Sequence, residues 1–172
     1  MKAVMISIQP KWCEKIASGE KTVEVRKTRP KTETPFPCFI YETKTPLRWN
    51  KAHNNIIGGE GGYVIGEFVC DEVFPIRVFE NGSIQDYVCH GMERSCVPYE
   101  DIADYIGKDK TGYGWHISDL VIYDTPKELS EFFKACDKPP LTDCSKCIDQ
   151  MKVACKPLSR PPQSWCYVEV QE

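Results

Sequence analysis

Two basic side chains and one acidic side chain are concentrated in a short segment near the start of the chain. Val23 and Val25 alternate with Glu24 and Arg26, which is the pattern of a β-strand with one apolar and one polar face. Lys21 precedes this strand in a predicted turn. The two cations suit binding of a phosphate or a carbonyl oxygen. The carboxylate suits acceptance of a base N–H or general-base chemistry.

The elements around this segment predict a strand–helix–strand unit. Ala3–Ile8 predicts the first strand, Pro10–Ser18 a short helix that begins with proline and stops at Gly19, and Thr22–Lys27 the second strand. A rigid scaffold of this kind can hold polar side chains in a fixed arrangement, which is typical of binding and catalytic sites.

The spacing Gly-x-Lys-x-x-Glu-x-Arg, formed here by Gly19, Lys21, Glu24 and Arg26, resembles the signature of the ASCH (activating-signal-cointegrator homology) domain, a relative of the PUA RNA-binding fold. The resemblance implies one ASCH/PUA-like domain over residues 1–172, of α+β class, with a PUA-like mixed β-barrel and a few flanking helices. Later segments also resemble bacterial and phage-type members, and they spread the likeness over nearly the whole chain: Gly66–Phe68, Trp115–Leu120, Tyr123–Asp124, Pro126–Leu129 and Arg160–Glu169.

The same resemblance implies a cleft between the barrel and the first helix, lined by Lys21, Glu24 and Arg26, with Glu67 opposite them on the long strand. Trp115 or Tyr113 would stack on a base there, as aromatic side chains do in proteins that read single-stranded RNA. Structural roles are the alternative. Glu24 and Arg26 would then form a salt bridge that orders the sheet, and Trp115 would be a core residue.

An enzymatic alternative comes from small bacterial ASCH proteins that deacetylate acetylcytidine. They resemble this chain in a lysine after the first helix and a glutamate on a later strand, so Lys21 and Glu67 are catalytic candidates. Glu24 stands where their pattern has threonine, and its carboxylate would hold Lys21 as an ammonium rather than a free amine. A ribonuclease activity, also associated with some ASCH domains, has less local signature, because metal-dependent cleavage would need more clustered carboxylates.

The charge distribution favours a polyanionic partner. The net charge is −3, but residues 1–31 contain eight Lys or Arg and three Glu, a local excess of +5 that leaves −8 for the remainder. Such asymmetry indicates RNA or a nucleotide-like ligand. The alternative is that several lysines only solvate the outer face of the first helix. No apolar run approaches the roughly 20 residues of a membrane span, and Ala3–Ile8 is too short for a secretion signal, so we expect a cytoplasmic protein with no membrane contact.

Ten cysteines are many for a chain of 172 residues. With no secretion signal, thiolate–metal chemistry is a sharper interpretation than disulfides. Cys144-x-x-Cys147 is flanked by Cys136 and Cys155, and four thiolates at ~2.3 Å would hold structural zinc in a Cys-rich insertion at about 136–157. A metal-free loop or a redox pair is the alternative.

Further elements follow from periodicity and from turn residues. Residues 44–62 predict a long loop ending in a glycine run, which would serve as a hinge or lid over the cleft or as a plain flexible turn. The pattern predicts helices at Val97–Ile106 and, after a capping box at Thr125–Glu128, through Phe132 and Phe133. It predicts strands at Phe39–Tyr41, Tyr63–Ile76, Trp115–Tyr123 and Trp165–Val170.

Three hypotheses result. The leading one is an ASCH-domain protein that binds RNA or a modified nucleoside through Lys21, Glu24, Arg26 and Trp115. The second is a hydrolase with Lys21 and Glu67 at its centre. The third is a zinc-stabilised protein-interaction module built on the cysteine cluster.

Overall fold

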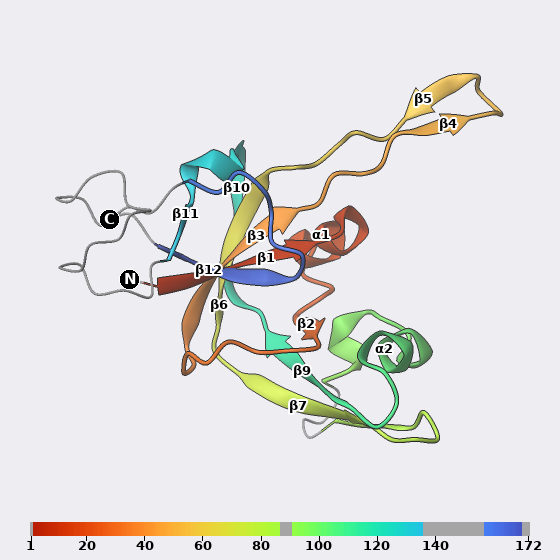
Figure 1. Cartoon of the computed structure of the whole chain (residues 1–172), viewed down its shortest axis with the longest axis vertical. Helices are drawn as coiled ribbons and strands as arrows, with labels where there is room; N and C mark the ends of the chain where they lie inside the picture. The colour runs from red at the N-terminus through yellow and green to blue at the C-terminus, as the bar shows by residue number, and fades with distance from the viewer. Residues whose placement is uncertain (1, 87–90, 136–156, 170–172) are drawn as a thin grey trace, which may run out of the picture. The chain divides into compact units, whose positions relative to one another are not determined.

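The computed structural model describes residues 2–86, 91–135 and 157–169 (Figure 1). The chain forms two compact units, each assembled from segments that are distant in sequence. The first unit comprises Met1–Cys13, Cys38–Glu67 and Ile122–Glu172, and the second comprises Glu14–Pro37 and Phe68–Val121. Each unit has a hydrophobic core of its own.

The first unit is built on a six-stranded sheet with the strand order β10-β6-β3-β1-β12-β11. In its centre, β1 pairs in parallel with β3 and antiparallel with β12. Six of the seven residues of β1 are buried, as expected for a central strand that is covered on both faces. The strands are β1 (Lys2–Ile8), β3 (Phe36–Glu42), β6 (Val64–Cys70), β10 (Ser118–Lys127), β11 (Phe133–Lys134) and β12 (Trp165–Glu169).

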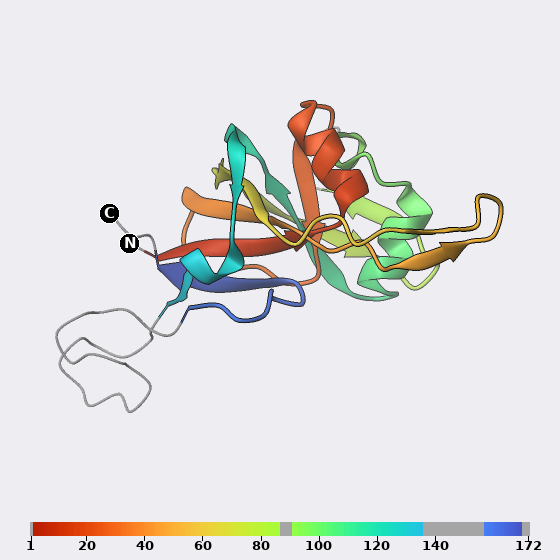
Figure 2. The same ribbon diagram turned by 90° about the horizontal axis from the view of Figure 1, so that it is seen from above.

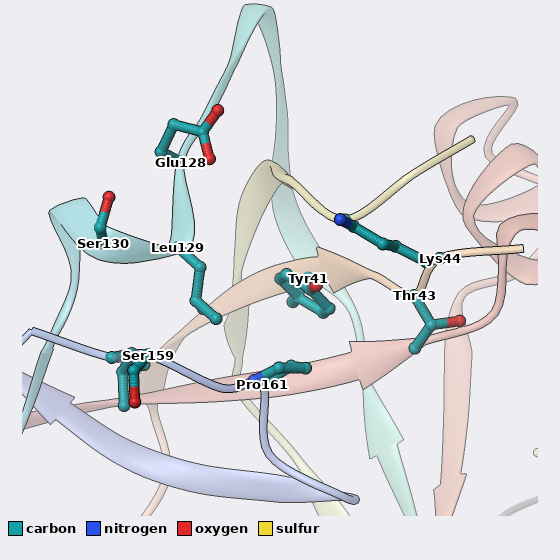
Figure 3. Close-up of a pocket in the computed structure, with 10 residues that line it drawn as sticks. Tyr41, Thr43, Lys44, Glu128, Leu129, Ser130, Ser159 and Pro161 are labelled. Atoms are coloured by element: carbon teal, nitrogen blue, oxygen red, sulfur yellow. The ribbon is translucent and has the colours of Figure 1, made fainter. Parts of the chain in front are cut away.

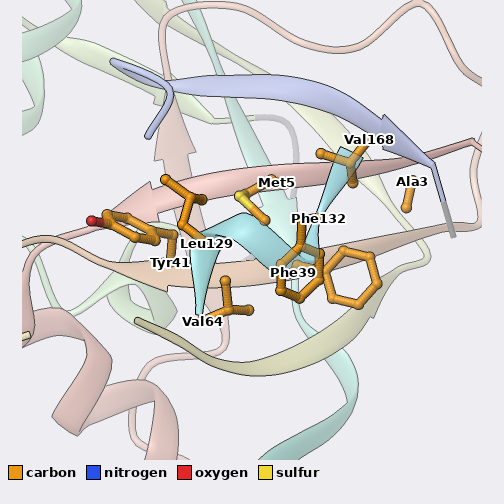
Figure 4. Close-up of a cluster of buried hydrophobic side chains, with 8 residues drawn as sticks. All are labelled: Ala3, Met5, Phe39, Tyr41, Val64, Leu129, Phe132 and Val168. Carbon is orange, nitrogen blue, oxygen red and sulfur yellow. The ribbon is translucent and has the colours of Figure 1, made fainter. Parts of the chain in front are cut away.

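The core of the first unit brings together side chains from the sheet and from the turn that follows β10 (Figure 4). Phe39 and Phe132 meet edge to face, with ring centroids 4.9 Å apart. Such aromatic pairs add to the stabilisation that burial itself provides. The buried members of this core are Ala3, Met5, Phe39, Tyr41, Val64, Leu129, Phe132 and Val168.

The second unit is built on a four-stranded sheet with the order β2-β9-β7-β8, covered by the helix α2 (Tyr99–Ile106). Helix α1 (Pro10–Ala17) leads into this unit along the chain. A short 3₁₀ turn, η1 (Glu93–Ser95), precedes α2. The strands are β2 (Val23–Arg26), β7 (Val73–Val78), β8 (Ile84–Asp86) and β9 (Thr111–His116).

Two glycines of β9 allow this core to close. A Cβ atom at Gly114 would lie 2.3 Å from Cζ of Phe74, and one at Gly112 would lie 2.6 Å from Cδ1 of Ile106. Both distances are too short for real side chains, so the ring of Phe74 and the end of Ile106 fill the space that a larger residue would take. The glycines of β9 are therefore explained by packing.

Residues 44–62 differ from the predicted loop, because they form a two-stranded ribbon, which we call the β4–β5 arm. The strands β4 (Arg48–Asn50) and β5 (Asn55–Ile57) pair antiparallel. Figure 2 shows the ribbon extending away from β3 and β6, the strands between which it is inserted. Backbone hydrogen bonds continue the ladder through its base, where the amides of Thr45 and Gly59 donate to the carbonyls of Glu60 and Thr45 at 2.8 and 2.7 Å.

Other predicted elements need correction. The run Tyr63–Ile76 is divided at residues 71–72 into β6 and β7, and the run Trp115–Tyr123 is divided at Ile117 into β9 and β10. The helix predicted through Phe132 and Phe133 is wrong. In its place a 3₁₀ turn, η2 (Leu129–Glu131), carries Leu129 and Phe132 into the core, and its capping box is formed by Glu128 and Glu131.

Thr125 to Lys127 belong to β10, which is an edge strand of its sheet. An edge strand tolerates Pro126, whose missing N–H removes no bond from the interior of the sheet. The predictions at Ala3–Ile8, Pro10–Ser18, Thr22–Lys27 and Trp165–Val170 match observed elements to within one residue over the described part of the chain.

The α+β class is confirmed. Within the described residues, each of the two larger sheets has two edge strands that do not pair with each other, so both sheets are open. The single-domain organisation stays a prediction, and the Cys-rich insertion lies almost wholly outside the described residues. None of the described helices is long and apolar enough to cross a membrane.

Candidate functional site

The second unit buries a group of three charged side chains, Lys21, Glu24 and Arg26, which we call the charged triad. Their exposed fractions are only 1%, 6% and 9%. Oε2 of Glu24 lies 3.1 Å from Nζ of Lys21, and its Oε1 lies 3.1 Å from an Nη atom of Arg26. The carboxylate thus bridges the two cations, one on each oxygen, which is an arrangement that can offset the cost of burying charge.

Lys21 is held from three directions. Its ammonium donates to the carbonyls of Val23 at 2.8 Å and Ser95 at 2.7 Å, and it forms the ion pair with Glu24. The two hydrogen bonds and the ion pair together compensate for the burial of this ammonium group. The backbone positions it as well, because the amide of Lys21 donates to the carbonyl of Lys15 at the end of α1.

The turn η1 fixes the triad from a distant part of the sequence. The amide of Thr22 donates to the carbonyl of Arg94 at 3.0 Å, and Nε of Arg94 donates to Oγ1 of Thr22 at 3.0 Å. Ser95, which supplies a carbonyl to Lys21, is itself fully buried. Sequence reasoning missed Arg94 and Ser95, because more than seventy positions separate them from their partners and no local pattern marks them.

Aromatic side chains share the sheet face that carries the acid and the guanidinium. In the β2–β9 register Glu24 is opposite Trp115 and Arg26 is opposite Tyr113. Residues directly opposite each other in a sheet project from the same face. Trp115 is fully buried and meets Phe36 edge to face, with centroids 5.8 Å apart. The structure therefore brings together four predicted ligand-binding residues in one unit, and it gives Trp115 the packing of a core residue.

Two exposed cations follow the end of β2. Lys27 and Arg29 follow β2 directly and are exposed. Nζ of Lys27 lies 4.9 Å from the ring centroid of Tyr105, and Cζ of Arg29 lies 5.9 Å from that of Tyr113. These four residues, Lys27, Arg29, Tyr105 and Tyr113, form what we call the basic–aromatic patch. Sequence reasoning counted the two cations in the basic N-terminal segment but did not pair them with tyrosines.

Glu67, the other predicted catalytic residue, belongs to the first unit and lies on β6. Its Oε2 accepts a hydrogen bond of 2.8 Å from the hydroxyl of Tyr123. Burial, the hydrogen bond and the negative charge of Glu67 all raise the pKa of Tyr123 above its usual value. The pair thus keeps the tyrosine neutral and the carboxylate oriented.

The first unit also contains a pocket of about 510 Å³ beside the base of the β4–β5 arm (Figure 3). Its floor is apolar, with Tyr41 buried beneath Leu129 and Pro161 at its edge. Lys44 and Glu128 supply opposite charges at its rim. Burial and the nearby carboxylate of Glu128 raise the pKa of Tyr41, so its phenol stays protonated.

The cysteines predicted to bind zinc, Cys136, Cys144, Cys147 and Cys155, lie outside the described residues. In the part of the chain that the structure describes, no group of three or more His, Cys, Asp or Glu side chains is arranged for a metal ion. Cys70 is fully buried there, and burial is the main cause that raises the pKa of its thiol to about 12. It behaves as a small apolar core residue.

The family is established by sequence. The ASCH domain family model matches residues 6–129, so the chain belongs to the ASCH domain family, which has a PUA-like fold. A comparison with curated proteins gives no match.

Solved structures agree with this fold. The chain is similar to the crystal structure of ASCH from Zymomonas mobilis, with a TM-score of 0.59 and 18% identity over 97% of this chain and 87% of that one. A serine-to-alanine variant of that protein gives a TM-score of 0.58 at 16% identity, covering 97% and 88% of the two chains. A tyrosine-to-phenylalanine variant gives 0.58 at 16% identity, covering 98% and 91%. At this level of identity the likeness establishes the fold.

Proposed function

We propose that this ASCH-domain protein binds RNA, or a nucleotide-like ligand, on the second unit around the end of β2. The observation that carries the proposal is the basic–aromatic patch, in which Lys27 and Arg29 each lie over a tyrosine ring, and the tyrosine under Arg29 lies opposite Arg26 of the charged triad. Proteins that bind single-stranded nucleic acid combine cations that follow the phosphates with aromatic rings on which bases stack. The patch offers both groups at the surface.

In this proposal Lys21, Glu24, Arg26 and Trp115 form the inner layer of the binding face. Arg26 is opposite Tyr113 in the sheet, so the triad and the patch are continuous through that pair. The bridged carboxylate keeps the guanidinium of Arg26 in place, and Phe36 fixes the ring of Trp115. The inner layer therefore positions the patch, and Lys27 and Arg29 make the phosphate contacts.

The geometry of Lys21 favours a binding protein over a hydrolase that uses this lysine. A lysine nucleophile or base needs a free electron pair on Nζ. Here Nζ donates to two carbonyls and lies 3.1 Å from the carboxylate of Glu24. Removing a proton would take from this buried carboxylate one of its two counter-charges, which opposes formation of the free amine.

Fluorescence anisotropy with a labelled single-stranded RNA of mixed sequence, titrated at several salt concentrations, tests the proposal. Each phosphate contact on a single strand contributes about −0.7 to the slope of log K against log salt. The double change Lys27→Ala, Arg29→Ala should therefore weaken binding and reduce the slope by about 1.4.

Lys127→Ala with Lys134→Ala is the matched control for this variant. It removes the same charge from exposed positions, and Lys127 also lies over a tyrosine, 4.3 Å from the ring centroid of Tyr123. Equal losses in the two double variants would contradict a specific role for the patch, because they would show only a response to net charge.

The hydrolase alternative has its own readout. Wild-type protein is incubated with acetylcytidine, and deacetylation is followed by chromatography. We expect no turnover. Turnover that disappears in both Lys21→Ala and Glu67→Gln, with the fold intact by circular dichroism, would replace the binding proposal by the hydrolase.

We also propose that Cys136, Cys144, Cys147 and Cys155 hold one structural zinc ion, for which the Cys-x-x-Cys spacing is the support. Elemental analysis of protein purified without added metal should give about one zinc per chain, reduced in Cys144→Ser. Cys96→Ser, at a half-exposed cysteine elsewhere, should leave the content unchanged. Protein without zinc would refute the site and, with it, the zinc-stabilised interaction module.

A further inference from the structure

We infer that the β4–β5 arm is a second RNA-contacting surface, distinct from the patch on the second unit; this inference rests on the proposed function. The arm spans residues 44–62 in the first unit and is an insertion between β3 and β6. Three observations lead to this conclusion: the two legs of the arm are paired as a ribbon, the arm exposes apolar side chains, and it carries a net positive charge.

The base of the arm is constructed for close pairing of its two legs. A Cβ atom at Gly58 would lie 2.3 Å from the carbonyl oxygen of Pro46, and one at Gly61 would lie 2.7 Å from that of Thr43. Both glycines also have positive φ, at 97° and 83°, where side chains are strained. The glycine run thus lets the legs approach and form their backbone hydrogen bonds.

The exposed apolar side chains of the arm indicate a contact surface. Leu47 is 69% exposed and Ile56 is 64% exposed, the two highest values among the large hydrophobic residues of the described chain. A two-stranded ribbon without a core is marginally stable in water. Two aliphatic side chains displayed on such a ribbon gain little from the fold of their own unit, and they would gain from a partner that covers them.

The charge of the arm favours a polyanion as its partner. Lys44, Arg48 and Lys51 are exposed, and no Asp or Glu occurs between Glu42 and Glu60. Within the described residues, no carboxylate forms an ion pair with any of these three cations. Residues 44–59 of the arm therefore carry +3, and Glu60 at its base lowers the net charge of the whole arm to +2, on a chain whose net charge is −3. RNA is the polyanion that the same protein is proposed to bind, and its unstacked bases offer apolar faces for Leu47 and Ile56.

The test compares two triple variants that lose the same charge within the same unit. Lys44→Ala, Arg48→Ala, Lys51→Ala removes the cations of the arm, and Lys127→Ala, Lys134→Ala, Arg160→Ala removes three exposed cations elsewhere. With labelled single-stranded RNA, the arm variant should bind more weakly, with a salt slope reduced by about 2. The control should retain the wild-type slope. Ile56→Ser should weaken binding without changing the slope, because it removes no charge.

The outcomes separate this inference from the proposed function. If the arm variant binds RNA with wild-type affinity and salt slope, the proposed role of the arm is wrong. The role of the basic–aromatic patch is tested separately by Lys27→Ala, Arg29→Ala. Wild-type protein that does not bind RNA at all would overturn both. Binding to anionic phospholipid vesicles that depends on the arm, with RNA binding independent of it, would assign the arm to a membrane surface and overturn the inference.

Discussion

The charged triad and the β4–β5 arm are both rich in positive charge, but they use it in opposite ways. In the triad, Lys21 and Arg26 are buried and share one carboxylate. In the arm, Lys44, Arg48 and Lys51 are exposed on a stretch, residues 44–59, that contains no acid. The charges of the triad pair with one another inside the second unit, whereas the cations of the arm are accessible to a partner. Burial therefore decides what a basic residue contributes.

The largest expected effect is on stability and comes from removing the acid of the triad. Glu24→Gln leaves Lys21 and Arg26 buried without a counter-charge, and breaking a buried ion pair in this way costs about 3–5 kcal/mol. Urea unfolding should show this loss as a lower midpoint. Asp109→Asn is the matched control, since it breaks an exposed pair with Arg77 and should cost no more than about 1 kcal/mol. Equal losses of unfolding free energy in the two variants would show that the buried triad is no more important for stability than an exposed ion pair.

Lys21→Met and Lys51→Met form the next pair. The first removes a buried ammonium that serves two carbonyls and a carboxylate, and we expect a loss of about 3 kcal/mol in the free energy of unfolding. The second changes an exposed arm residue and should stay within about 0.5 kcal/mol. A Lys51→Met variant as unstable as Lys21→Met would show that the arm is part of the stabilising structure.

Gly58→Ala tests whether the two legs of the arm pair closely at its base. The new methyl group would meet the carbonyl of Pro46, so the pairing of the two legs should be lost. Hydrogen exchange should speed up at the amides of Thr45 and Gly59 and leave β9 unchanged. Gly82→Ala is the control, because Gly82 has a similar φ of 81° but open space around its Cβ position. Unchanged exchange at the base of the arm in Gly58→Ala would contradict the close pairing.

The smallest effect concerns a polar pair in the unit that carries the arm. The pKa of Tyr123 is raised above its usual value of about 10 by burial and by Glu67. Its hydrogen bond therefore stabilises the fold fully below about pH 10, and this contribution is lost as the pH rises above that value. Tyr123→Phe should cost about 1 kcal/mol at pH 8 and should lose less stability than wild type between pH 9 and pH 11. Parallel urea titrations at these pH values would show it, and identical pH dependence in the two proteins would refute it.

Much of the second unit could be predicted from local sequence. The alternation around Glu24 and Arg26 specified β2, and Pro10 and Gly19 marked the limits of α1, because these signals depend on a few neighbouring residues. The helix ending at Gly107 was also confirmed, although it begins at Tyr99 rather than Val97. Where an element is long enough and has its own start and stop residues, the interactions between neighbouring residues are sufficient to predict it from the sequence.

Predictions failed where distant segments compete. The capping box at Thr125–Glu128 is a valid local signal, but pairing of β10 along its sheet and the need to bury Leu129 and Phe132 replaced the helix by a strand and a 3₁₀ turn. The glycine run at the base of the arm was ambiguous, because the same residues suit a flexible turn and a close pairing of two chains.

The sequence by itself determined that the chain is an ASCH-domain protein, which residues carry charge in its signature, and where that charge is concentrated. Only the tertiary structure decided which of these charges are available. Ser95 and Arg94 close around Lys21 and Thr22 from more than seventy residues away, whereas Lys44 and Arg48 of the arm stay exposed. Whether a charged side chain is desolvated and paired or exposed depends on what the rest of the chain packs against it, and no local pattern contains that information.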